Sequence, residues 1–170
     1  MQKGNQRGGF DPNKAVPDKV VDTIVKAGCQ APIGGNQRDS LHLTVCRSRD
    51  ILDEINQATA AAMKIEPRDF FYGAPAAIFV SAAPKQMAPS VEYANAACVI
   101  ENMLIAATDA RVDSIYLWGA VQALARNPEL CAKMGILEGF KPVSAAALGY
   151  SLSGSTEPRV LSVSLNTNYI

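Results

Sequence analysis

The most constraining feature of this sequence is a long helix candidate that is apolar on almost every side. It covers residues 90–107, is rich in alanine, and contains the runs Ala96-Ala97-Cys98-Val99-Ile100 and Met103-Leu104-Ile105. An ordinary surface helix keeps a polar face toward water, so a helix of this composition needs cover on most sides. We therefore expect either a central helix within one domain or a helix that a second subunit covers.

The remaining segments alternate between strand and helix patterns. Apolar or alternating runs predict strands at 41–46, 76–81, 114–118 and 143–152. Helical spacing predicts helices at 17–29 and 50–63, and Asn127 is expected to cap a short helix that Gly135 ends. A length of 170 residues suits one domain. We therefore expect a single α+β domain over residues 1–170, with residues 153–170 as an extended C-terminal arm.

Composition excludes several classes of function. Lys and Arg number 16 and Asp and Glu number 16, so no bulk positive charge favours a nucleic acid partner. No apolar run of about 18 residues is present, which argues against a membrane span. The single histidine, His42, leaves little room for a histidine metal site or a hydrolytic triad. The four cysteines are far apart, so we expect reduced, mostly buried thiols, no metal and a cytoplasmic protein.

Two short segments could contact a ligand. Gly34-Gly35-Asn36 lies between a predicted helix and a predicted strand, where glycine permits close approach and asparagine offers a donor and an acceptor. Trp118-Gly119-Ala120 follows a predicted strand, and a glycine there would let a flat ring lie near a backbone N–H. Each segment alone is also compatible with a plain loop or turn. Arg7 and Arg159, taken singly, are compatible with solvated charges.

Six stretches, in a fixed order between residues 5 and 152, carry a resemblance to a known family. They are Phe10-Asp11-Pro12 through Val16-Pro17-Asp18, Ala31-Pro32-Ile33-Gly34-Gly35-Asn36, Leu41-His42-Leu43-Thr44-Val45, Phe71-Tyr72-Gly73-Ala74-Pro75-Ala76, Glu101-Asn102-Met103-Leu104-Ile105-Ala106-Ala107, and Gly135-Ile136 through Leu148-Gly149-Tyr150. Together they resemble the nitroreductase family of flavin enzymes in its compact form. The second stretch resembles the A-P-S-x-x-N flavin loop of that family, and the fifth resembles its central helix.

The resemblance implies a three-layer α+β fold, with a central, mostly antiparallel sheet flanked by helices, and an obligate homodimer. It implies two FMN molecules at the dimer interface, each contacted by both subunits. It also implies ping-pong chemistry, in which NAD(P)H reduces the flavin and leaves before a nitroaromatic, a quinone or a similar small electrophile takes the electrons. We expect no catalytic side chain, and the donor to the flavin N5 is expected to be the backbone N–H of Gly119 or a neighbour.

The resemblance also assigns the residues expected to bind FMN. They are Gln6, Arg7, Gly8, Pro32, Ile33, Gly34, Asn36, Trp118, Gly119 and Arg159. The sequence departs from the family at the phosphate clamp R-S-x-R, which falls on Asn5-Gln6-Arg7-Gly8 with neither arginine in its place. Arg7, Arg159 and the N–H groups around Gly8-Gly9 are therefore the candidates for the phosphate, and we expect weaker FMN binding than in relatives with the clamp.

Further alternatives stay open at the level of sequence. Ile33 stands where the family has a serine, and Asn36 and Gln37 compete for the role of the loop asparagine. The chain could be a flavin-binding protein of the same fold with weak or lost catalysis. It could also be a purely structural domain, which would require the loop at 34–36 to be buried in an ordinary core.

Overall fold

The computed structural model describes residues 8–83, 90–153 and 165–170. Its elements in chain order are α1 (Asp18–Cys29), β1 (Leu41–Cys46), α2 (Arg49–Met63), β2 (Ala76–Ala82), α3 (Val91–Asp109), β3 (Asp113–Leu117), α4 (Gly119–Leu124), α5 (Pro128–Lys133) and β4 (Lys141–Gly149). Two short 3-10 turns, Gly34–Asn36 and Arg38–Ser40, connect α1 to β1.

The four described strands form one antiparallel sheet in the order β1-β2-β4-β3. Its centre is the pair β2–β4, in which every residue of β2 is buried and only Lys141 of β4 is exposed. Strands with both faces covered carry continuous apolar runs rather than alternation, which is the pattern of residues 76–82 and 142–148. The expectation of a mostly antiparallel sheet is confirmed, and every strand pair in it is antiparallel.

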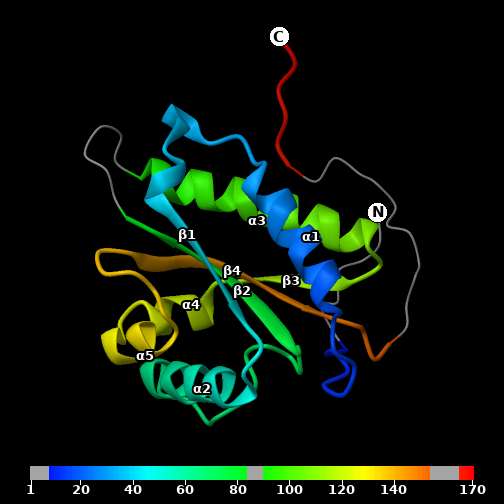
Figure 1. Cartoon of the computed structure of the whole chain (residues 1–170), viewed down its shortest axis with the longest axis vertical. Coiled ribbons are helices and arrows are strands. Elements are labelled where there is room, and N and C mark those ends of the chain that lie inside the picture. The colour runs from blue at the N-terminus through cyan, green and yellow to red at the C-terminus, as the bar shows by residue number, and fades with distance from the viewer. Residues whose placement is uncertain (1–7, 84–89, 154–164) are drawn as a thin grey trace.

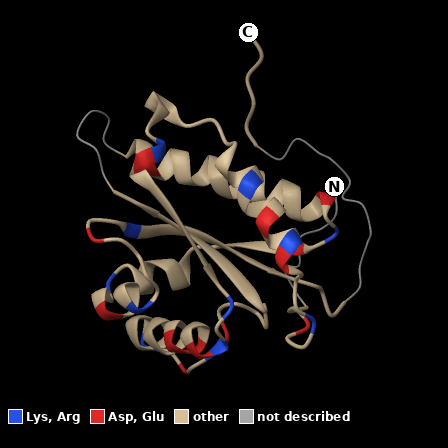
Figure 2. Ribbon diagram, in the orientation of Figure 1, with Lys and Arg blue, Asp and Glu red and all other residues tan. Residues whose placement is uncertain are grey.

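Helices cover both faces of this sheet and make three layers (Figure 1). Helices α1 and α3 pack on one face, where Ile24, Ile78 and Met103 belong to one buried cluster. Helices α2, α4 and α5 pack on the other face, where Leu52, Phe79 and Leu124 belong to a second cluster. The charged side chains gather along α2 and at helix ends, whereas the strands carry few (Figure 2).

Helix α3 is only half covered by its own chain. Val99 and Met103 on its inner side are buried against α1 and the sheet, and Asn95 is buried beside Gly34 of the loop that follows α1. On its outer side, Tyr93 is 50% exposed and Ile105 is 56% exposed. A central helix covered on most sides within one chain is therefore wrong for this structure. The alternative, a helix that a second subunit covers, stays a prediction.

Sequence patterns located most elements to within a few residues. The strand at 41–46 has the predicted bounds, and Asn127 caps α5 by accepting from the Leu130 N–H at 3.1 Å. The last strand ends at Gly149 rather than at residue 152, and the strand at 113–117 ends before Trp118. Helix α4 was not predicted, because six residues are too few to show helical spacing. The arm at 153–170 lies largely outside the described residues.

The thiols differ in part from the expectation. All four cysteines are free, but only Cys46 is buried, whereas Cys98 and Cys131 are half-buried and Cys29 is exposed. Burial raises the pKa of the Cys46 thiol, although hydrogen bonding with the backbone of Ser48 acts in the opposite direction. The prediction of mostly buried thiols is therefore wrong for three of the four residues.

A partly buried turn between α2 and β2 depends on Asp69. One carboxylate oxygen accepts from the backbone N–H of Phe71 at 2.8 Å and from Asn56 Nδ2 at 3.1 Å. The other accepts from the Gly73 N–H at 2.8 Å and from Arg49 Nη2 at 3.2 Å. Burial raises the pKa of Asp69, but these hydrogen bonds and the Arg49 charge outweigh it, so the pKa is lowered overall.

The lowered pKa makes the contribution of Asp69 to stability depend on pH. The ionised form is favoured in the folded state, so the stabilisation is full above the unfolded pKa and is lost as pH falls through the folded pKa. Asp69→Asn would turn an NH₂ group toward the Gly73 N–H and Arg49, so it should lower the free energy of unfolding by about 1–3 kcal/mol at pH 7. Urea unfolding should show this difference shrinking below about pH 4.

Asp18→Asn is the matched control, because the Asp18 carboxylate pairs with Arg47 but its side chain is 90% exposed. Exposed ion pairs contribute little, so this variant should leave the unfolding curve nearly unchanged at both pH values. Equal losses of unfolding free energy in Asp69→Asn and Asp18→Asn would contradict the role given to Asp69.

Candidate functional site

The loop that leaves α1 is exposed at its tip and anchored at its base. Gly34, Gly35 and Asn36 are exposed, and both Gly35 and Asn36 have left-handed backbones with φ of 65° and 52°. The Gly34 N–H donates to Asn95 Oδ1 of α3 at 2.8 Å. A Cβ on Gly34 would lie 3.2 Å from Val91 Cγ2 and 3.3 Å from Asn95 Oδ1, so glycine permits this close approach. The loop is therefore exposed, contrary to the requirement of a purely structural domain.

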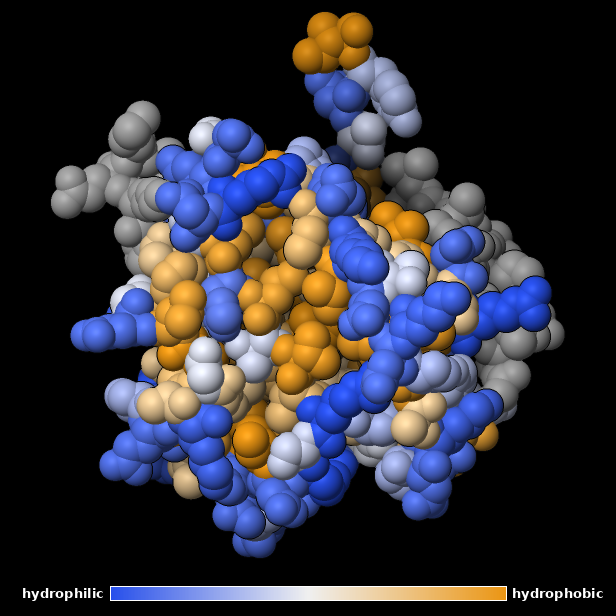
Figure 3. Space-filling model, viewed as in Figure 1, coloured by the Kyte–Doolittle hydropathy of each residue, from blue (hydrophilic) through white to orange (hydrophobic). Residues whose placement is uncertain are grey.

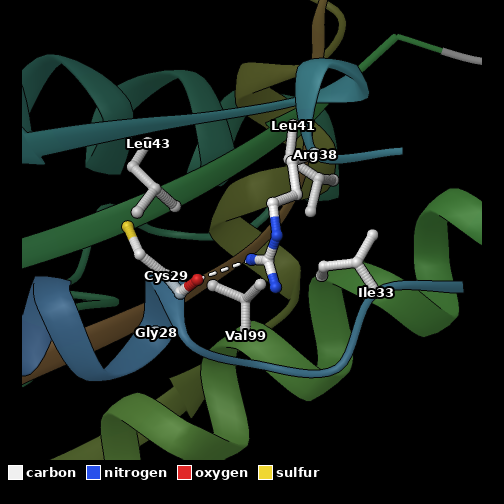
Figure 4. Close-up of a pocket in the computed structure, with 7 residues that line it drawn as sticks. All are labelled: Gly28, Cys29, Ile33, Arg38, Leu41, Leu43 and Val99. Carbon is white, nitrogen blue, oxygen red and sulfur yellow. Dashed lines mark hydrogen bonds between the residues drawn. The ribbon is translucent and has the colours of Figure 1, made fainter. Parts of the chain in front are cut away.

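The other end of the loop is held by Arg38. Its guanidinium donates to the carbonyl of Cys29, the last residue of α1, at 2.6 Å (Figure 4). It also donates to the Ala31 carbonyl at 3.2 Å. Cationic donors are favourable beside the last carbonyls of a helix. The side chains of Arg38 and Ile33 line a cavity of about 160 Å³ together with residues of α1, β1 and α3. Ile33 is thus half-buried, whereas its neighbour Pro32 is exposed.

The second predicted segment lies on the opposite face of the sheet. Trp118 is 50% exposed, and Gly119 begins α4. The first backbone hydrogen bond of α4 runs from the Gln122 N–H to the Trp118 carbonyl, so the Gly119 N–H precedes the helical bonds. A Cβ on Gly119 would lie 2.9 Å from Met63 Cε at the end of α2. This corner therefore offers an exposed indole, a backbone donor and a flexible thioether.

The predicted phosphate ligands fall mostly outside the described residues. Gln6, Arg7 and Arg159 are among the residues whose structure is not described. Gly8 is exposed, and the next residue, Gly9, accepts a hydrogen bond from the Leu152 N–H at 3.2 Å. The start of the C-terminal arm and the residues after the predicted clamp are therefore neighbours.

The predicted residues thus form two separate groups within one chain. The loop at 32–36 approaches α3 through Gly34 on one face of the sheet, and the corner at 118–119 approaches the end of α2 through Gly119 on the other. His42 is a half-buried residue of β1, and its ring packs edge-on against Phe140 with centroids 6.0 Å apart. In the described ranges, no group of three His, Cys, Asp or Glu side chains could hold a metal ion. No helix there is long and apolar enough to cross a membrane.

Sequence reasoning missed the two residues that shape the loop, Asn95 and Arg38. Asn95 is only 3% exposed, and the only signal for it is a polar residue inside a largely apolar helix. Arg38 follows the predicted loop directly, but its partners Cys29 and Ala31 become visible only in the folded chain.

Comparisons with known proteins agree on one family. The family model described as the nitroreductase family matches residues 6–150. A nitroreductase with bound FMN from Bacteroides fragilis superposes with a TM-score of 0.79 and 24% identity, over 97% of this chain and 95% of that chain. A nitroreductase with bound FMN from Desulfitobacterium hafniense gives 0.79 and 22%, over 96% and 93%. An FMN-dependent nitroreductase from Clostridium difficile gives 0.78 and 18%, over 99% and 96%. The curated proteins contain no match to this chain.

Proposed function

The chain belongs to the nitroreductase family, and from that premise we propose that it binds FMN and passes electrons from NAD(P)H to small electrophiles. The proposed acceptors are nitroaromatics, quinones or similar compounds, and the proposed order is ping-pong. Several of the solved nitroreductases similar to this chain hold FMN.

The observation that carries this proposal is the neutral donor set of the candidate site. The polar or aromatic groups among the predicted ligands in the described part of the chain include a backbone N–H at Gly119, an exposed indole at Trp118 and the exposed amide of Asn36. These groups suit a flat, neutral ring with hydrogen-bonding edges, and none of them is a general acid or base. The residues therefore fit a flavin, with the redox chemistry belonging to the cofactor.

Bound FMN would accept a hydride from NAD(P)H and release the electrons to the acceptor. The chain would hold and orient the ring. The Gly119 N–H is free of helical bonds and can donate to the ring edge at N5, and Trp118 offers an apolar surface beside it. His42 packs on Phe140 instead of joining this group, so it has no assigned role in proton transfer.

We propose that the site is completed by a second copy of the chain. The loop at 32–36 and the corner at 118–119 lie on opposite faces of the sheet, so a single flavin that touches both needs two subunits. The outer side of α3 leaves Tyr93 and Ile105 exposed, and Val45 on the edge strand β1 is 42% exposed. Apolar side chains also gather in the middle of the face shown in Figure 3. Such surfaces are typical of obligate homodimers, and the arm at 153–170 is proposed to lie along the partner.

A second candidate is a flavin-binding protein of this family with weak or lost catalysis. The observation that favours it is the N-terminal clamp, because uncharged Asn5 and Gly8 occupy the positions of the two family arginines. Fewer cationic partners for a doubly charged phosphate weaken the binding of FMN.

The first test is a spectrum of the purified protein with added FMN. We expect flavin binding, seen as quenched FMN fluorescence, and loss of the yellow absorption when NADH or NADPH is added without oxygen. A protein that binds FMN but is not bleached by either nucleotide would support the second candidate. A protein that takes up no FMN would contradict both.

Gly119→Val tests the proposed donor. The new side chain must displace Met63 and stands beside the N–H, so flavin bleaching by NAD(P)H should slow by at least about tenfold. Gly119→Ala is the matched control, because a single methyl meets only the flexible end of Met63. His42→Ala should keep most of the activity. Flavin bleaching at the wild-type rate in Gly119→Val would contradict the role assigned to this backbone donor.

Arg7 and Arg159 are proposed to replace the missing clamp. Each charge-assisted contact contributes about 1.5–3 kcal/mol, so changing both to Gln should weaken FMN binding about 100-fold or more. Riboflavin, which lacks the phosphate, should bind with nearly unchanged affinity. Arg126→Gln, an exposed arginine after α4, controls for net charge. Unchanged FMN affinity in the double variant would place the phosphate elsewhere.

A further inference from the structure

We propose that Asn95 is a positioning residue, which holds the 31–36 loop in the shape that accepts the flavin. This inference rests on the proposed function, because the loop is assigned to FMN there. It concerns a side chain that belongs to α3, stands 61 positions from its partner in sequence and is absent from the expected cofactor ligands.

Apart from the side chains of other segments, few contacts hold the loop in one conformation. Its tip is exposed, and a backbone hydrogen bond within it joins the Asn36 N–H to the Ile33 carbonyl at 3.1 Å. Asn36 also has a positive φ of 52°, which costs free energy for a residue with a Cβ even though asparagine tolerates it better than most. A loop of this kind would sample other conformations unless contacts from outside select one.

Two side chains supply those contacts, one at each end. Arg38 joins the Cys29 and Ala31 carbonyls at the point where α1 ends. Asn95 Oδ1 accepts from the Gly34 N–H at 2.8 Å, and Val91 one turn earlier packs against the same glycine. Asn95 therefore fixes the height of the tip above α3, while Arg38 fixes the direction in which the chain leaves α1.

Only one of the two polar atoms of the Asn95 side chain forms a hydrogen bond, and this identifies the oxygen as the atom that positions the loop. Its Oδ1 is used, but its Nδ2 is buried without a partner, as is Oε2 of Glu92. A buried donor without a partner costs free energy, so the residue is not explained by stability alone. An aspartate would also supply the acceptor, but it would add a second carboxylate three positions from the buried Glu92. Asparagine provides the acceptor without the charge.

The test uses three variants and two readouts. Asn95→Leu removes the acceptor, and Asn95→Asp keeps it. Asn127→Leu removes a similar bond, in which a backbone N–H of α5 donates to an asparagine oxygen, away from the loop. The first readout is the Kd for FMN from fluorescence quenching. The second is hydrogen exchange of the backbone amides at 33–36 in protein without FMN, which needs no cofactor.

We expect Asn95→Leu to raise the Kd at least about tenfold, because the apparent Kd rises in inverse proportion to the fraction of chains with a competent loop. Its amides at 33–36 should exchange at least about tenfold faster. Asn95→Asp should keep both values within about threefold of the wild type, even where it lowers stability through Glu92. Asn127→Leu should lower stability and leave both values unchanged. If Asn95→Leu does not fold, Asn95→Ala makes the same comparison.

Wild-type values for both readouts in Asn95→Leu would overturn the proposal. So would a loss of FMN affinity in Asn127→Leu equal to that in Asn95→Leu, because it would reflect general destabilisation. If the wild type binds no FMN, the proposed function fails. The exchange readout then still decides whether Asn95 orders the loop.

Discussion

The arrangement of this protein depends on one constraint, the complete burial of the central strand pair β2–β4. Backbone groups of buried strands must pair with each other, and apolar side chains on both faces must be covered. Helices α1 and α3 cover one face, and α2, α4 and α5 cover the other. The loop after α1 and the turn after β3 therefore emerge on opposite sides of the sheet, which separates the two halves of the candidate site within a chain.

Because the two halves of the candidate site are separated within one chain, we propose that cofactor binding depends on the association of two chains. Each half offers neutral hydrogen-bonding groups and exposed surface, and neither half encloses a ring alone. A second copy would bring a loop from one chain to the Gly119 corner of the other and would cover the outer side of α3 around Ile105. The association of two chains would then contribute to stability and to cofactor binding at once. We propose this on the basis of the family to which the chain belongs.

The sequence predicted features that depend on neighbouring residues and missed those that depend on distant ones. Alternation located the strand at 41–46, and the Asn127 cap marked the start of α5, because both signals lie within a few residues. Helix α4 was not predicted because its six residues, GAVQAL, are too few to show the helical period. The outer side of α3 is exposed in the single chain, so cover by the same chain is wrong, but composition could not distinguish this from cover by a partner, which stays a prediction. Asn95 escaped because its bond to Gly34 exists only in the folded chain.

The most direct test of a shared site is a mixed dimer. One chain carries Gly119→Val and the other carries Gly34→Val, whose side chain would crowd Val91 and Asn95. Two affinity tags isolate the dimer that contains one of each. Homodimers of Gly34→Val should bind no FMN, and homodimers of Gly119→Val should bleach their FMN at least about tenfold more slowly than the wild type. The mixed dimer should bind one FMN that NAD(P)H bleaches at the wild-type rate, because one of its two sites combines an intact loop with an intact Gly119. A mixed dimer whose FMN bleaches only at the slow Gly119→Val rate would place both halves of each site within one chain and contradict the account.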